Sequence, residues 1–267
     1  MWKAIGLIGR DKLLQKDITP GIIQKHPFFL NGQKGVGKTA LLQWAYEKTK
    51  ERKAYFSATE TVKEMLITIA AQWHLQIVNQ GKAVSPEKAQ LSVLEKAVAQ
   101  VDSGILFIDD INKATPTKIR RFRQWKERFT LYVAGSPPYR EDLKQILWGL
   151  KEIEVKPIPK EERERLARLM CTHHGAALMI EDVARESRGI PGRMMAMALG
   201  NQIDRSSERV KEEEIDISWT ILFVIVAIAA TRYIGMGLGR IDLYILGGIF
   251  MGFGLLLRFF LYKFQKK

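Results

Sequence analysis

The chain has 267 residues, with 42 Lys and Arg against 29 Asp and Glu, and a formal net charge of +13. Its length accommodates one α/β core with smaller additions, and its charge favours anionic partners, either nucleic acid or an acidic membrane face. A single cysteine, Cys171, excludes an intramolecular disulfide framework, and with only His173 and His174 beside it we expect a structural cluster rather than a metal site.

The N-terminal stretch MWKAIGLIGRDK contains no apolar run of the kind found in a secretory signal. We therefore expect the residues that precede the apolar C-terminal segments to remain in the cytosol.

The strongest motif is PFFLNGQKGVGKTALLQWAYE, in which an apolar strand, Pro27 to Leu30, leads into Gly32-x-x-x-x-Gly37-Lys38-Thr39 and a helical pattern starting at Ala40. This is the P-loop pattern in its strand–loop–helix context. Loop N–H groups and the helix N-terminus would surround phosphates, Lys38 would reach the β and γ phosphates, and the Thr39 hydroxyl would bind Mg²⁺. The residues expected to hold the nucleotide are Gly32, Gln33, Lys34, Gly35, Val36, Gly37, Lys38, Thr39 and Ala40.

A second acidic strand end follows in GILFIDDIN. Ile105 to Ile108 is a short apolar run typical of a buried parallel strand, and it ends in Asp109 and Asp110. We expect Asp109 to hold the magnesium shell and Asp110 to act as the general base that orients the attacking water.

Further strands and helices alternate around these motifs. Lys53 to Ser57 and Thr130 to Ala134 read as strands, the second followed by Gly135 and Ser136, and Thr61 to His74 and Pro86 to Val101 read as helices. This alternation predicts an α/β fold, a parallel sheet with helices on both faces. The phosphate site would then lie at the carboxyl ends of the strands.

The segment Lys118 to Phe129, KIRRFRQWKERF, carries six basic residues and one acidic residue in twelve positions. Ile119, Phe122, Trp125 or Lys126, and Phe129 recur at helical spacing, which predicts one apolar face against the sheet. The basic face could serve as an arginine finger in trans, contact nucleic acid, dock on anionic lipid, or simply be solvated.

From Lys160 onward three helical patterns, EERERLARLM, MIEDVARES and GRMMAMALGNQI, predict a small helical lid. Pro191 marks the turn before the last pattern. The polar sequence RSSERVKEEEID then reads as a short connector.

Two apolar segments follow, Ser218 to Gly237 and Leu243 to Tyr262, each with one arginine, Arg232 and Arg258. Each is close to the roughly 20 residues that a membrane-spanning helix needs. The basic residues on both flanks predict a two-helix hairpin with both termini in the cytoplasm. GxxxG spacing in the second segment is explained equally well by specific helix packing and by the general glycine richness of membrane helices.

The order GRDKLL, P-loop, FIDD, a strand ending in Ser136, and GIPGRMM resembles AAA+ ATPases of the initiator-like group, which includes transposition regulators and secretion ATPases and is related to STAND proteins. The resemblance spans about residues 5 to 205. It implies that Ile8, Gly9 and Arg10 help to hold adenine, that Ser136 is sensor 1, and that Arg193 is sensor 2, reaching the γ-phosphate from the lid. It also implies ATP as the nucleotide.

Two features depart from that family. Asp110 stands where the family has Glu, and the stretch ILWGLKEIEV lacks the usual arginine finger, so that Arg140 is the nearest upstream candidate.

The predicted organisation is a nucleotide-binding α/β domain (1–158), a helical lid (159–204), a charged connector (205–216), a transmembrane hairpin (217–262) and a basic tail (263–267). The leading prediction is an ATPase of the inner or cytoplasmic membrane that uses ATP and Mg²⁺, self-assembles, and acts on a membrane-located process or on a protein partner there. The alternatives are a STAND-like ATP-dependent switch whose hairpins form a membrane effector, and a membrane-tethered ATP-dependent DNA-binding protein, although the chain has no dedicated nucleic-acid module.

Overall fold

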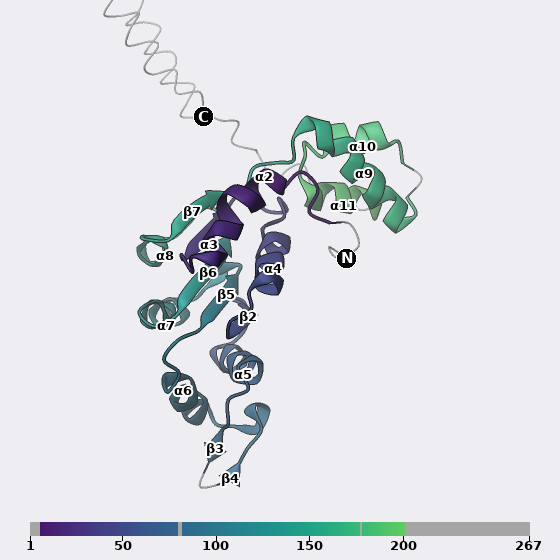
Figure 1. Cartoon of the computed structure of the whole chain (residues 1–267). Coiled ribbons are helices and arrows are strands. Elements are labelled where there is room, and N and C mark those ends of the chain that lie inside the picture. The colour runs from purple at the N-terminus through teal and green to yellow at the C-terminus, as the bar shows by residue number, and fades with distance from the viewer. Residues whose placement is uncertain (1–5, 80–81, 177, 201–267) are drawn as a thin grey trace, which may run out of the picture. The chain divides into compact units, whose positions relative to one another are not determined.

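The computed structural model describes residues 6–79, 82–176 and 178–200 (Figure 1). The chain divides into two compact units, Met1–Ile203 and Asp204–Lys267, and the second lies wholly outside the described residues. The predicted connector, hairpin and basic tail therefore also lie outside them. Within the three described ranges, no helix is long and apolar enough to cross a membrane.

A five-stranded parallel sheet forms the centre of the first unit, with the order β2-β5-β6-β1-β7. Its apolar runs form strands because both faces of a parallel sheet are covered and need continuous hydrophobic sequence. The strands predicted around the P-loop, the acidic pair and Ser136 are confirmed to within one residue at each end. The strands are β1 Phe28–Asn31, β2 Lys53–Ser57, β5 Ile105–Asp109, β6 Thr130–Gly135 and β7 Lys151–Glu154.

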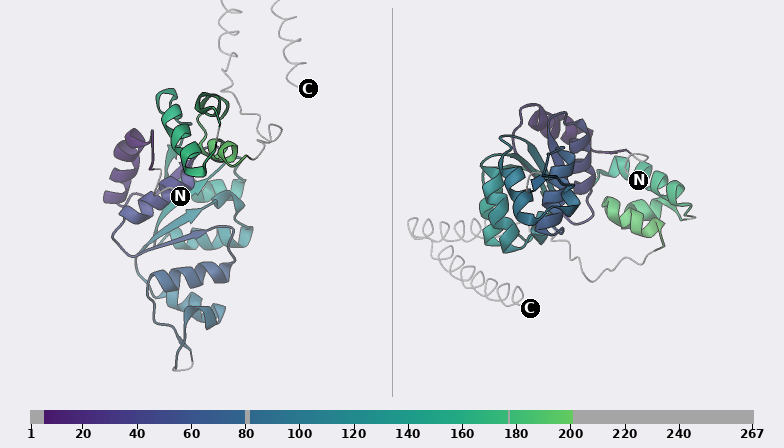
Figure 2. Two further views of the ribbon diagram at one scale, coloured as in Figure 1. Left: turned by 90° about the vertical axis from the view of Figure 1, so that its right-hand side faces the viewer. Right: turned by 90° about the horizontal axis from the view of Figure 1, so that it is seen from below.

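Helices cover both faces of this sheet, as Figure 2 shows. Their starts follow recognisable signals: Thr61 and Glu64 form a capping box before α5, and Pro116 and Pro191 occupy the first turns of α7 and α11. The helices are α2 Asp11–Leu13, η1 Leu14–Ile18 (a π-helix), α3 Thr19–Ile23, α4 Lys38–Lys48, α5 Val62–Gln72, η2 Pro86–Lys88, α6 Leu91–Ala99, η3 Ile111–Lys113, α7 Pro116–Lys126, α8 Glu141–Leu147, α9 Lys160–His174, α10 Ile180–Glu186 and α11 Pro191–Ala198.

The helix expected from Pro86 to Val101 is divided in the structure. A short 3₁₀ turn, η2, ends at Lys88, and α6 begins only at Leu91. Ala89 lies between them in extended conformation and is buried in the core. This extended, buried residue interrupts the helix that the sequence pattern predicted. The hairpin of β3 Val78–Asn79 and β4 Lys82–Ala83, which precedes η2, was not predicted.

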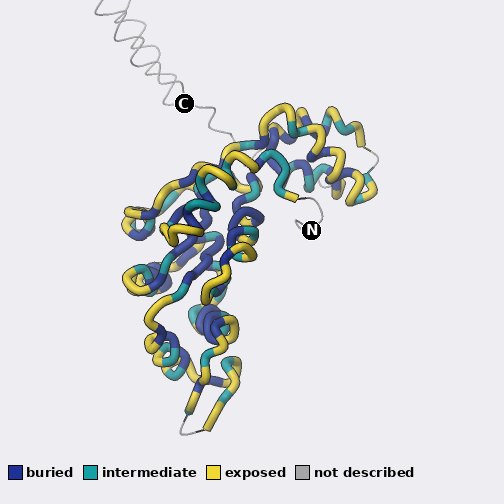
Figure 3. The backbone as a smooth tube through the Cα atoms, in the orientation of Figure 1, coloured by how far each residue is buried: buried dark blue, intermediate teal, exposed yellow. Residues whose placement is uncertain are grey.

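Alternate residues of β1, β2, β5 and β6 face two separate cores, whereas β7 buries only Ile153. Phe29, Phe56 and Ile108 pack with α5, α6, α7 and α8, whereas Phe28 and Phe107 pack with α3 and α4. The central strands β5, β6 and β1 therefore appear as largely buried segments in Figure 3. A third cluster, which includes Leu166, Met170, Val183 and Met194, holds the helices α9, α10 and α11 together as the predicted lid.

Candidate nucleotide-binding site

The P-loop connects the carboxyl end of β1 to the first turn of α4. Gly37 has a φ of 104°, a left-handed conformation that suits glycine because it has no Cβ. Lys38 follows as the first residue of α4. The loop N–H groups and the positive end of an 11-residue helix thus form the kind of environment that binds phosphate.

The Lys38 ammonium lies inside this loop. Nζ donates hydrogen bonds to the carbonyl oxygens of Gly32 and Gln33, at 2.8 and 2.7 Å, and to Ser136 Oγ at 2.8 Å. Burial lowers its pKa from the usual 10.5 to about 8, against the opposing effect of the charges of Asp109 and Asp110. At neutral pH the side chain is therefore a buried cation whose charge can be directed at an anion.

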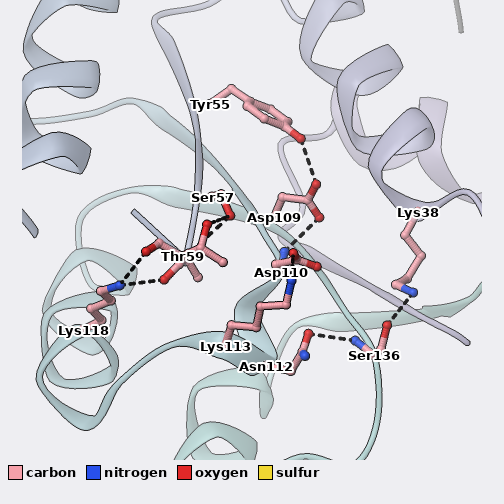
Figure 4. Close-up of polar contacts among 11 residues, drawn as sticks. Lys38, Tyr55, Ser57, Thr59, Asp109, Asp110, Asn112, Lys113, Lys118 and Ser136 are labelled. Atoms are coloured by element: carbon pink, nitrogen blue, oxygen red, sulfur yellow. Dashed lines mark hydrogen bonds and ion pairs between the residues drawn. The ribbon is translucent and has the colours of Figure 1, made fainter. Parts of the chain in front are cut away.

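The predicted acidic pair lies at the end of β5, the strand next to the outermost strand β2 (Figure 4). Asp109 is buried, and its two carboxylate oxygens accept hydrogen bonds from Tyr55 Oη at 3.0 Å and from the Asp110 backbone N–H at 2.9 Å. Burial, and then the charge of Asp109, raises the pKa of Tyr55, so this hydroxyl remains a donor.

Asp110 lies in a different environment. Its φ of 53° is left-handed, and its half-exposed carboxylate pairs with Lys113 Nζ at 2.6 Å. Such an exposed ion pair contributes about 1 kcal/mol or less. The carboxylate is thus accessible at the sheet edge but held toward η3.

Ser136 lies between the P-loop and the acidic pair because β6 separates β1 from β5 in the sheet. Its hydroxyl accepts the hydrogen bond from Lys38, and its backbone N–H donates to Asn112 Oδ1 at 3.1 Å. The structure thus brings together Lys38, Ser136 and the acidic pair, as the motif order predicted (Figure 4).

A cavity of about 710 Å³ lies beside the P-loop, within the range of roughly 300–1,000 Å³ found for ligand pockets. Ile8 and Gly9 of the N-terminal segment and Ala40 of α4 line it, together with Trp44 and the lid residue Arg165. The cavity is therefore adjacent to three of the residues predicted to bind nucleotide.

Arg10, predicted to help hold adenine, makes structural contacts. Its guanidinium is buried and donates to the carbonyl oxygens of Lys156 and Val36, both at 2.6 Å. Burial lowers its pKa from 12.5 to about 10. These contacts tie the P-loop to the chain that leads into the lid, and a direct contact with a base stays a prediction.

The lid touches the P-loop through backbone atoms. The Gly192 N–H donates to the Gly35 carbonyl at 2.8 Å, and a Cβ at Gly192 would lie only 2.8 Å from Gly35 Cα. Within the lid region, Gly189 O accepts from the N–H of Ile158, which lies just before α9, at 2.7 Å. Arg193 follows Gly192 in the first turn of α11, so its backbone is one residue from the P-loop contact, while its reach to a γ-phosphate stays a prediction.

The oxygen donors at the sheet edge suit Mg²⁺. The Asp109 carboxylate and the exposed Thr39 lie at the ends of β5 and of the P-loop, and Mg²⁺ in nucleotide sites combines one or two protein oxygens with phosphate oxygens. Within the part of the chain that the structure describes, no three His, Cys, Asp or Glu side chains gather as a metal site. Cys171 is buried, and His173 and His174 contact each other edge to face.

The basic helix α7 packs as predicted and uses much of its charge internally. Its apolar residues Ile119, Phe122 and Trp125 are buried, as is Phe129 just beyond it. Five of the six basic side chains in the segment Lys118 to Phe129 hydrogen-bond within the chain: Lys118 to Ala58 and Thr59, Arg121 to Glu95, Arg123 to Gln145, Lys126 to Ile146 and Trp148, and Arg128, just after the helix, to Ala99 and Val101. These contacts fit a structural role better than a basic surface for nucleic acid or lipid.

Three side chains that support this site were not predicted: Tyr55, Asn112 and Lys118. Tyr55 stands on β2, 54 positions before Asp109, and Lys118 holds the β2–α5 loop from 60 positions away. Of the three, only Asn112, which lies three residues after Asp109, could have been suspected from the local sequence. The short amide side chain of an asparagine beside a strand end can bond neighbouring backbone groups.

No protein-family model and no curated protein matches this sequence. Solved structures of similar fold include a RuvB variant from Thermotoga maritima, with 16% identity over 72% of this chain and 62% of that one, and a TM-score of 0.47. Domain III of the Thermotoga maritima replication initiation protein DnaA has 17% identity over 75% and 89% of the two chains, with a TM-score of 0.48. Cdc6p from Pyrobaculum aerophilum has 17% identity over 74% and 65%, with a TM-score of 0.45. The chain thus spans less than two thirds of the RuvB structure, and the likeness assigns no activity.

Proposed function

We propose that this chain binds and hydrolyses ATP as an AAA+-type ATPase and passes its nucleotide state through the lid to a process at a membrane. The observation that carries the proposal is the convergence of the buried Lys38 ammonium, Ser136 and the Asp109–Asp110 pair at one sheet edge. These groups supply a cation for phosphate, a carboxylate for a metal and a second carboxylate for water.

Each group has a defined task in this proposal. When nucleotide binds, Lys38 gives up its hydrogen bonds to the carbonyl oxygens of Gly32 and Gln33 and binds phosphate oxygens instead. Ser136, which is hydrogen-bonded to Lys38 in the empty site, then senses the phosphate through the position of that lysine. Asp110 orients the attacking water and accepts its proton. Mg²⁺, held by Thr39 and Asp109, would neutralise charge on the transferring phosphoryl group.

Lid movement follows from the contact between Gly35 and Gly192. Because the P-loop carbonyl is bonded directly to the first turn of α11, any shift of the loop around phosphate moves or breaks that bond. Arg193, next along α11, would contact the γ-phosphate and so distinguish ATP from its product.

A second candidate is an ATP-loaded switch that turns over slowly or not at all. The ion pair between Asp110 and Lys113 favours it, because a carboxylate oxygen that already accepts from a lysine is less free to accept a hydrogen bond from an attacking water. In this reading ATP binding alone drives assembly of the chain at the membrane.

Nucleotide binding and turnover by the full chain in detergent separate the two candidates. We expect Lys38→Ala to lose nucleotide binding. Asp110→Asn should keep binding but lose turnover by roughly 100-fold or more, the usual contribution of a general base. Asn is the suitable replacement because it tolerates the left-handed φ of 53° at this position.

The outcomes discriminate clearly. Turnover per protomer that rises with protein concentration and is lost in Asp110→Asn supports an ATPase completed by self-assembly. Tight ATP binding without turnover at every concentration favours the switch, and release of dye from liposomes on ATP addition would then test a membrane effector. A wild-type chain that binds no nucleotide would contradict both.

Membrane attachment is the remaining part of the proposal, with the α/β domain and both termini on the cytoplasmic side. It rests on the two apolar segments Ser218 to Gly237 and Leu243 to Tyr262 alone. The full chain should stay in the membrane fraction after alkaline carbonate washing, whereas a chain ending at residue 204 should not. Release of the full chain by carbonate would refute integral attachment.

A further inference from the structure

We propose that Tyr55 is a positioning residue that fixes the carboxylate of Asp109 for the metal, and that Gln72 holds Tyr55 in place for this task. The inference rests on the proposed function and extends it to a residue outside the nucleotide motifs. It starts from a contact between two strands. Tyr55 Oη donates to Asp109 Oδ2 at 3.0 Å, while the Asp110 backbone N–H donates to Oδ1 at 2.9 Å (Figure 4).

The sheet register explains why this tyrosine can reach the carboxylate. Tyr55 pairs with Phe107 in the parallel β2–β5 ladder, and Asp109 lies two residues farther along β5. Residues two apart on a strand face the same side, so Tyr55 and Asp109 share the face of the sheet that α4 covers. A tyrosine is long enough to reach along that face, and its ring packs edge to face on Tyr46 of α4, with ring centres 5.8 Å apart.

The backbone of Tyr55 is fixed in an unusual way for an edge strand. β2 is the outermost strand of the sheet, and among the residues that the structure describes no further strand bonds its outer backbone groups. The Gln72 side-chain amide takes that place: Oε1 accepts from the Tyr55 N–H at 2.8 Å, and Nε2 donates to the Tyr55 carbonyl at 3.3 Å. Gln72 Oε1 also accepts from Tyr46 Oη at 3.2 Å, which joins α4 to the same clamp.

These contacts restrict the rotation of a buried carboxylate. With one donor on each oxygen, Asp109 is held in a single orientation before any metal arrives. Hydrogen bonds of this outer-shell kind orient metal ligands, and their loss typically costs 10–100-fold in metal affinity. The clamp therefore makes the edge strand part of the metal site, although no residue of β2 belongs to a nucleotide motif.

The test separates metal binding from nucleotide binding. Binding of a fluorescent ATP analogue to the full chain is measured in EDTA and across a Mg²⁺ titration, for wild type, Tyr55→Phe and the control Tyr132→Phe. Tyr55→Phe removes the hydroxyl that bonds Asp109. Tyr132→Phe removes a hydroxyl from the same face of the sheet, where it donates to the Gly21 carbonyl instead.

We expect Tyr55→Phe to keep the EDTA affinity within about twofold and to raise the Mg²⁺ midpoint by roughly tenfold or more. Tyr132→Phe should leave both values near wild type. An unchanged Mg²⁺ midpoint in Tyr55→Phe, or an equal shift in both variants, overturns the positioning role while leaving the proposed function intact. A wild-type chain that binds no nucleotide overturns the proposed function and this inference with it.

Discussion

Nucleotide affinity should fall as the pH rises above about 8, and Lys38 should be the cause. In the empty site burial lowers the pKa of this lysine to about 8. Nucleotide phosphates next to Nζ favour the charged form and raise that pKa again. Binding therefore takes up a proton wherever the empty site is deprotonated and the occupied site is not.

The magnitude follows from this difference in pKa. Above the pKa of the empty site, each further pH unit weakens apparent affinity by up to tenfold, or about 1.4 kcal/mol, until the pKa of the complex is reached. We expect a loss of roughly tenfold between about pH 8.5 and 9.5. The last pKa of a phosphate group lies near 6, so the phosphates are fully ionised above about pH 8.5 and their titration does not contribute in this window.

Isothermal titration calorimetry with ATP and Mg²⁺ in buffers of different ionisation enthalpy measures both the affinity and the proton uptake. Lys38→Arg is the control, because a guanidinium remains charged throughout the scan. This variant should bind ATP more weakly than wild type, but its affinity should not fall as the pH rises. Equal pH slopes in wild type and Lys38→Arg would refute the role of Lys38, as would binding without proton uptake near pH 9.

The stability of the nucleotide-free protein should change with pH in the opposite direction to its affinity for nucleotide. Below about pH 8 the lysine is charged in both states, and folding carries the full cost of burying it. Between about 8 and 10.5 the unfolded chain binds more protons, so this group makes the folded state more stable as the pH rises. The total change is on the order of 3 kcal/mol.

Three further predictions concern packing. Gly192→Ala places a Cβ 2.8 Å from Gly35 Cα, so it should destabilise the fold by about 1–3 kcal/mol in denaturant unfolding and increase amide exchange in the lid; wild-type stability would show that the lid does not touch the P-loop. Lys118→Met leaves a buried carbonyl of the β2–α5 loop unpaired and should lower the free energy of unfolding by about 1–3 kcal/mol. The control, Arg120→Met at an exposed position, should change it by about 0.5 kcal/mol or less, and equal effects of the two substitutions would contradict this. Cys171 is buried and burial raises its thiol pKa, so iodoacetamide should label it only after denaturation, and rapid labelling of the native chain would refute its burial in the lid.

Much of the site could be predicted because its groups stand at strand ends. A parallel sheet brings the carboxyl ends of its strands to one edge, so finding Lys38 after one strand, Asp109 at the end of another and Ser136 after a third was enough to expect them together. The apolar face of α7 could be predicted as well, because its apolar residues recur with the period of a helix.

The supporting contacts had no such signal. Tyr55 and Gln72 look like ordinary residues of a strand and a helix, and only the β2–β5 register and the edge position of β2 give them a task. The basic residues of α7 show the converse. Their charge suggested an external partner, but a local sequence cannot reveal that carbonyl groups and a carboxylate of the same chain lie within reach of them.

The helix α11 is the shortest route from nucleotide to the C-terminal part of the chain. Its first turn is bonded to Gly35 of the P-loop, and its last residue, Ala198, precedes the connector by only a few positions. Eight helical residues span about 12 Å, and a packed helix moves as a rigid body. If ATP moves the P-loop and the bond between Gly35 and Gly192 holds, the displacement at Gly192 appears at the far end of α11. A spin-label pair on Ala196 and a P-loop-distant site such as Ser92 would report it as an ATP-dependent distance change, and an identical distance with and without ATP would show that the lid does not transmit the nucleotide state.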